Sequence, residues 1–155
     1  MIEGISLFLS GKNFMPQSFI ERIKEYKDCD IVSYHNIGDK VVRKLIAEEG
    51  ECQIIKKDDI GLPGKIKQYE SWYIKFIKDN IELISKSNID EVQIWIDLYM
   101  TKGSHGYEVF NKEQLAFLGK MNVSIPVTIH VMTKKEIIQF AKDNKIQYQN
   151  LDDLF

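Results

Sequence analysis

The chain is predicted to fold as one α+β domain, because segments with strand periodicity and segments with helix periodicity are interspersed along it. Residues 91–100 alternate strictly between aliphatic and polar or aromatic side chains, as in a strand with one buried face. Residues 69–87 place apolar side chains at helical spacing and predict a long amphipathic helix. Two or three strands follow one another between helices, which favours a mixed or antiparallel sheet with helices on one face. The expected layout is ferredoxin-like, with an added hairpin and a C-terminal helix.

The length of 155 residues is that of a single domain. No repeat, low-complexity tract or linker divides the chain. We therefore expect one α+β domain over residues 1–155, which ends in a tail over residues 146–155.

The first third of the sequence predicts a strand, a helix and a second strand. Residues 4–10 alternate cleanly and form the first strand. Pro16 opens the helix, because proline is favoured at the first helical position, and residues 28–30 end it. Residues 31–35 predict a short strand, which a turn at residues 38–39 follows.

The next segment has two interpretations. The first is a hairpin that turns at Gly50, with arms over residues 41–47 and 52–56. The second is a helix through the apolar residues at positions 42, 45 and 46. Residues 56–64 contain two glycines and a proline, which break any period and predict a loop.

Two capping boxes mark the helices of the last third. Asn111 is followed by Gln114, and Thr133 by Glu136, which is the spacing at which two backbone donors are satisfied reciprocally. Between these helices, residues 123–131 predict a strand. Pro126 within it favours an edge position or a bulge, because proline cannot donate to a strand ladder.

Composition excludes several functional classes. The 21 basic and 23 acidic residues are interleaved and give a net charge of −2, so the chain lacks the basic footprint of a nucleic-acid-binding protein. No apolar run approaches the roughly 20 residues of a membrane helix, and the N-terminus has no secretory pattern. These features predict a cytoplasmic protein without a membrane partner. Phosphate-binding loops, zinc spacings and nucleophile elbows are missing, so no catalytic residue, metal or cofactor is predicted.

One side of the predicted sheet carries polar and aromatic residues together. Trp95, Asp97 and Tyr99 lie opposite the aliphatic side of residues 91–100. On residues 123–131 the corresponding side includes His130, and if the two strands share a sheet Asp97 and His130 come within reach. This side is either a binding face, with aromatic area and a few directing polar groups, or an ordinary solvent-facing side.

Acidic side chains form the second candidate site. They lie at the tip of the predicted hairpin and in the loop that follows it, and they are Glu48, Glu49, Glu51, Asp58 and Asp59. Together with Trp95, Asp97, Tyr99 and His130 they make up the predicted partner-binding residues.

The layout resembles a family of small bacterial proteins of unknown function. The resemblance lies in the strand over residues 5–11 and the helix that begins near Pro16, then in the Gly-Asp turn at residues 38–39. It continues in the aromatic step Glu70-Ser-Trp72 and in the closing helix and strand, Phe110-Asn-Lys-Glu-Gln-Leu-Ala-Phe-Leu-Gly-Lys-Met and Val123-Ser-Ile-Pro-Val. It covers roughly residues 1–132 and departs from the family in a longer segment over residues 41–56. The family offers no catalytic residues.

By analogy of size, mild acidity and missing active-site motifs, the chain is also similar to bacterial immunity proteins. We therefore expect a non-enzymatic binding protein whose partner is a toxin that it neutralises by occlusion. One alternative is a small ligand-binding domain or enzyme that uses Asp97 and His130. Another is a structural homodimer that buries Trp95 and Tyr99.

Overall fold

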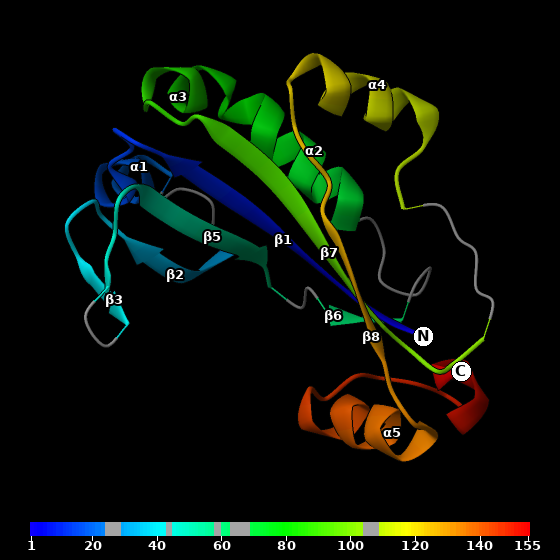
Figure 1. Cartoon of the computed structure of the whole chain (residues 1–155). Helices are drawn as coiled ribbons and strands as arrows, with labels where there is room; N and C mark the ends of the chain where they lie inside the picture. Colours follow the sequence, from blue (N-terminus) through cyan, green and yellow to red (C-terminus); the bar gives the residue numbers. More distant parts are fainter. Residues whose placement is uncertain (24–28, 43–44, 58–59, 63–68, 104–108) are drawn as a thin grey trace.

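The computed structural model describes residues 1–23, 29–42, 45–57, 60–62, 69–103 and 109–155. Strands and helices are interspersed along the chain, with five strands in succession between α1 and α2 (Figure 1). In order, the elements are β1 (Ile2–Gly11), α1 (Pro16–Arg22), β2 (Cys29–His35), β3 (Lys40–Val42), β4 (Leu45–Ile46), β5 (Gly50–Lys56), β6 (Ile60–Gly61), α2 (Tyr69–Asp79), α3 (Ile81–Lys86), β7 (Glu91–Met100), α4 (Lys112–Lys120), β8 (Val127–Val131), α5 (Lys134–Asp143) and the short 3₁₀ helix η1 (Leu151–Leu154).

The main sheet is mixed, and the predicted α+β class is confirmed. Its strands run in the order β2-β5-β1-β7-β8, and β6 pairs with one end of β1. The pairs β2–β5, β5–β1 and β1–β7 are antiparallel, whereas β7–β8 is parallel. The four strands β2, β5, β1 and β7 have the order of the ferredoxin-like split βαβ unit. β8 extends this unit beyond β7, and β3 and β4 form a separate hairpin.

The first face of the sheet carries the larger core. The buried side chains of β1 on this face, Ile5, Leu7 and Leu9, belong to one apolar cluster with Phe19 of α1 and Leu118 of α4. Residues of α2 and α3 join the same cluster, and Figure 1 shows α1 to α4 on one side of the strands. The predicted placement of helices on one face therefore holds for these four helices.

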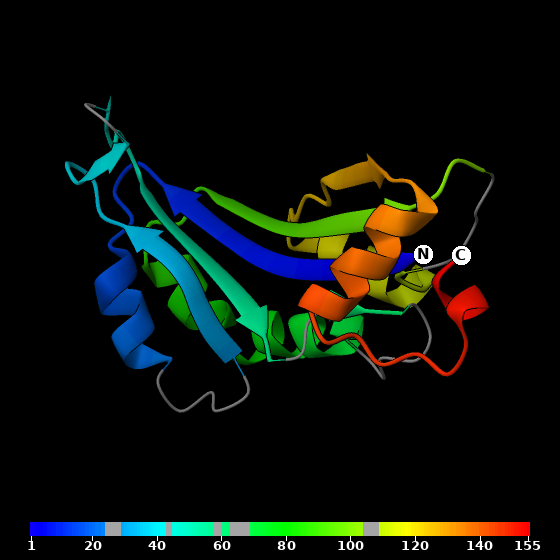
Figure 2. The ribbon, with the colours of Figure 1, turned by 90° about the horizontal axis from the view of Figure 1, so that it is seen from below.

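The C-terminal helix packs on the opposite face, at one end. Ile137 and Ala141 of α5 form a second cluster with Ile2 of β1 and Leu154 of η1, and all four are fully buried. In Figure 2, which views the sheet from below, α5 lies in front of the strands and α2 and α3 lie behind them. The tail thus packs back on its own domain, and among the elements that the structure describes α5 and η1 cover the second face of the sheet at this end.

The segment from residue 40 to residue 56 differs from the predicted hairpin. The hairpin is shorter, because β3 pairs with β4, while β5 pairs with β1 and β2 in the main sheet. Gly50 is therefore not a turn but the first residue of β5, opposite Gly11 of β1. The competing helix is also absent from the described part of this segment.

Other boundaries also differ from prediction. Helix α1 ends at Arg22 rather than at residues 28–30, β2 begins at Cys29 rather than at residue 31, and Ile60–Gly61, expected within a loop, form β6.

The helix expected over residues 69–87 is interrupted at Asn80, whose side-chain amide donates to the carbonyl oxygen of Phe76 at 2.9 Å. The last strand begins at Val127 rather than residue 123, because only a single bridge, Gln93–Ser124, precedes Pro126. β8 is an edge strand, as Pro126 favours, but the backbone groups of Pro126 face β7, where its carbonyl oxygen accepts from Ile96 and no N–H is available to donate. The regular strand therefore begins only after this proline.

A buried tyrosine holds α2 against the sheet where two strands diverge. The Tyr73 hydroxyl donates to the carbonyl oxygen of Ile5 at 2.6 Å and accepts from the backbone N–H of Lys56 at 3.1 Å. The β1–β5 register pairs Leu7 with Ile54, so Ile5 and Lys56 stand opposite each other two residues further along. The hydroxyl thus bridges backbone groups of both strands next to the point where β6 replaces β5 beside β1.

Candidate functional site

The candidate site is the side of the main sheet opposite α1 to α4, which we call the open face. Strand register arranges its side chains in rows across β5, β1 and β7. The rows are Glu51, Ser10 and Glu91; then Gln53, Phe8 and Gln93; then Ser6 beside Trp95; and then Gly4 beside Asp97. Ser6 and Ser10 are buried within these rows, so the accessible surface of the face is formed mainly by the acidic, amide and aromatic side chains around them.

The centre of the open face is an exposed tryptophan held in a fixed position. Trp95 is 37% exposed, and its Nε1 donates to Oε1 of Gln93 at 2.7 Å. Gln93 in turn donates through Nε2 to Glu91 Oε2 at 3.0 Å. The Phe8 ring meets the indole edge-on, with centroids 6.5 Å apart. An indole fixed in this way presents apolar area at a small entropic cost, which is the property of residues that dominate binding energy at interfaces.

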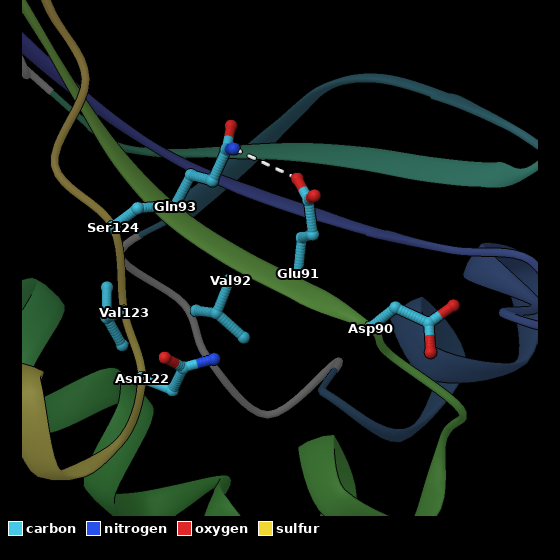
Figure 3. Close-up of a pocket in the computed structure, with 7 residues that line it drawn as sticks. All are labelled: Asp90, Glu91, Val92, Gln93, Asn122, Val123 and Ser124. Atoms are coloured by element: carbon cyan, nitrogen blue, oxygen red, sulfur yellow. Dashed lines mark hydrogen bonds between the residues drawn. The ribbon is translucent and has the colours of Figure 1, made fainter.

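A small polar hollow lies beside the start of β7. It measures about 230 Å³ and is formed by residues 90–93 and 122–124. Figure 3 shows Glu91 and Gln93 joined by their hydrogen bond on one side of β7, with Asn122 and Ser124 on the segment that leads to β8. Asp90 Oδ2 accepts from the backbone N–H of Lys12 at 2.8 Å, which ties the end of β1 to this corner.

The acidic end of the open face adjoins the β3–β4 hairpin. Oε2 of Glu51 lies 3.3 Å from Nε2 of His35, and both side chains are partly buried. A hollow of about 460 Å³ extends from this pair to the hairpin and is lined by Lys12, His35, Val41, Leu45, Ile46, Ala47, Glu48, Glu49 and Glu51.

The hairpin itself exposes apolar side chains beside these acids. Leu45 is 70% exposed and Ile46 is 59% exposed, and Val41 is also exposed. Exposed residues of this size, gathered and rimmed by charged groups, are typical of protein-interaction surfaces rather than of a solvated loop. Sequence reasoning assigned the acids at this end but missed the hairpin's apolar residues, because it placed their strand inside a longer hairpin.

The other end of the open face holds the predicted carboxylate–imidazole pair. His130 Nε2 lies 3.1 Å from Asp97 Oδ1, because the parallel register sets Tyr99 beside His130 and Asp97 two residues before it. The imidazole also stacks on Tyr99, with centroids 4.5 Å apart and planes 9° apart. The Tyr99 ring also stacks on the ring of Phe140 of α5, with centroids 4.2 Å apart. The Asp97–His130 pair therefore lies beside α5, the helix that covers this end of the open face.

The structure brings most of the predicted site residues to one face, but in two groups. Trp95 and Glu51 lie on the open part of the face, and Glu48 and Glu49 adjoin it in the connection from β4 to β5. Asp97, Tyr99 and His130 lie beside α5. Asp58 and Asp59 lie outside the described residues.

Other site types are missing from the part of the chain that the structure describes. It contains no cluster of three His, Cys, Asp or Glu side chains that could hold a metal ion. None of its helices combines the length and apolar character needed to span a bilayer.

No protein-family model, curated protein or solved structure matches this chain. Its function is therefore inferred from the chemistry and geometry of the open face.

Proposed function

We propose that the chain is a non-enzymatic binding protein that occludes a basic protein partner with its open face, as a cytoplasmic immunity protein does with a toxin. The observation that carries this proposal is Trp95, an exposed indole fixed by hydrogen bonding at the centre of the face. Buried tryptophans at interface centres commonly contribute about 2 kcal/mol or more to binding, or about 30-fold in affinity.

The charge of the partner is inferred from the acidic end of the face. Glu51 and Glu91 flank Ser10 across three strands, and Glu48 and Glu49 lie beside them around the hollow at the hairpin. A surface of this sign accelerates encounter with a positively charged partner and disfavours an acidic one. The exposed side chains of the β3–β4 hairpin add apolar area at the rim.

The test starts from capture of a stoichiometric partner from the native cell and continues with purified components. Trp95→Ala should weaken the complex about 30-fold or more, since it removes the central anchor. The triple substitution Glu48→Lys, Glu49→Lys and Glu51→Lys should lower the association rate and reduce its salt dependence. Leu115→Ala, on the exposed surface of α4, is the matched control and should leave affinity unchanged.

Two outcomes would contradict the proposal. Unchanged affinity in Trp95→Ala removes the centre of the open face from the interface. Unchanged association kinetics in the triple variant removes its acidic end. In a toxin–immunity pair, the wild-type chain must also restore growth to cells that express the captured partner, and Trp95→Ala must do so less well.

A second candidate function rests on the Asp97–His130 contact of 3.1 Å. A carboxylate in this position fixes the tautomer of the imidazole, which suits a ligand-binding group or a general base. The same residues also anchor α5 through Tyr99 and Phe140. Asp97→Asn separates the two roles: a ligand site would lose binding while the thermal melting of the domain stayed near that of wild type. Loss of stability without loss of any ligand would leave only the anchoring role.

A further inference from the structure

The outer edge of β8 is an apolar strand edge that nothing covers in the described part of the chain. β8 is the last strand of the sheet order, and Figure 2 shows it as the outermost strand. Val127, Ile129 and Val131 are between 53% and 67% exposed, although each is large and aliphatic. Strands at sheet edges are ordinarily protected by charges, bulges or covering segments, because their unpaired backbone groups can recruit another strand.

The backbone N–H and C=O groups of these three residues point away from β7, because these groups alternate in direction along a strand. Ile94 and Ile96 of β7 donate to the carbonyl oxygens of Ser124 and Pro126, and Met132 donates back to Met100. The backbone groups of the even-numbered residues of this segment thus face β7. Because pairing alternates along a strand, the odd-numbered positions 127, 129 and 131 direct their N–H and C=O groups away from the sheet. Pro126 falls on the β7 side, so its missing donor does not interrupt the outer edge.

The edge is complementary to itself. An antiparallel pairing centred on Ile129 sets that residue against Ile129 of a second copy and Val127 against Val131 of a second copy. All three outward residues then form hydrogen-bonded pairs, for about six backbone hydrogen bonds in total. Their side chains lie on one face of the joined sheets and contact each other as aliphatic cross-strand pairs, which stabilise antiparallel pairing. No Lys, Arg, Asp or Glu lies between residues 127 and 131, so the pairing brings no like charges together.

We propose that two copies of this chain associate through antiparallel β8–β8 pairing centred on Ile129, which joins their sheets into one. This inference does not rest on the proposed function, because β8 lies two strands away from the β1–β5 part of the open face. It also differs from an interface through Trp95, which stays exposed in the pair.

Sedimentation equilibrium of the purified chain tests the pairing. The wild-type chain should show a concentration-dependent dimer. Ile129→Lys places two ammonium groups against each other at the two-fold axis and should leave only monomer at concentrations where the wild type is mostly dimer. Leu115→Lys adds the same charge at another exposed aliphatic position, on α4, and should leave the dimer intact.

Amide hydrogen exchange on the wild-type chain gives a readout that needs no variant. The N–H of Ile129 should exchange more slowly as concentration rises, whereas the N–H groups of Thr128 and His130, which face β7, should not respond. A wild-type chain that remains monomeric at millimolar concentration would overturn the proposal. A dimer that Ile129→Lys leaves intact, or an Ile129 amide that is insensitive to concentration in the dimer, would overturn it as well.

Discussion

Replacing Tyr73 by phenylalanine is expected to destabilise the fold out of proportion to the single oxygen removed. The Tyr73 hydroxyl makes one hydrogen bond to Ile5 of β1 and one to Lys56 of β5, and the side chain is fully buried. Each bond contributes about 1 kcal/mol net, and a buried backbone group left without a partner costs about 1–3 kcal/mol. Since Phe fills nearly the same volume, no cavity adds to this. We expect a loss of about 2–4 kcal/mol.

Urea unfolding followed by tryptophan fluorescence measures this loss directly. The slope of the transition should not change, because the surface exposed on unfolding stays the same. Thermal melting should fall by about 4–16 °C, given about 2–4 °C per kcal/mol for a domain of this size. Tyr34→Phe is the control, because Tyr34 is half exposed on the edge strand β2, and it should change stability by less than about 0.5 kcal/mol. A Tyr73→Phe variant as stable as that control would refute the bridging role of the hydroxyl.

Two further predictions concern a pair of glycines and a buried cysteine. A methyl group at Gly11 would lie 2.3 Å from the carbonyl oxygen of Asn88, so Gly11→Ala should lower the free energy of unfolding by about 1–3 kcal/mol. Gly119 on α4 faces open space, so Gly119→Ala should raise the free energy of unfolding by about 0.5–1 kcal/mol. Urea unfolding of both variants checks these opposite signs. Burial raises the pKa of the Cys52 thiol from its ordinary value of 9.0 to about 12, and the charge of Cys29 adds to the shift. The unfolded chain therefore releases this proton first, and stability should fall by up to about 1.4 kcal/mol per pH unit between pH 9.0 and about 12. A Cys52→Val variant should show a shallower decline over that range, and an identical decline would contradict this assignment.

Local signals in the sequence predicted much of the fold. The alternation over residues 91–100 located β7 and its buried side, since a strand's side-chain direction depends only on position. The capping boxes at Asn111 and Thr133 are both formed, because they need only residues three apart. The Asp97–His130 contact follows from the alternation of side-chain direction along each strand, once the two strands are taken as neighbours.

The features that sequence reasoning missed depend on contacts between distant segments. Residues 50–56 have strand character, but their partners are β1 and β2 rather than the preceding residues, and no local pattern specifies that choice. The apolar side of α5 is visible in the sequence, yet its position on the open face is set by Ile2 and Tyr99 at the far ends of two strands. The exposure of the β3–β4 hairpin and of β8 likewise depends on which segments the helices cover in the folded chain. The two apolar surfaces proposed as interfaces can therefore be recognised only in the structure.

The central claim, that the open face around Trp95 binds a protein partner, can be tested through the fluorescence of that residue. The chain has two tryptophans, and in a Trp72→Phe background the emission comes from Trp95 alone. Titration with the captured partner should shift the emission to shorter wavelength and protect it from a soluble quencher, because the indole passes from partial exposure to burial. Formation of a stoichiometric complex with unchanged emission and unchanged quenching would contradict the claim.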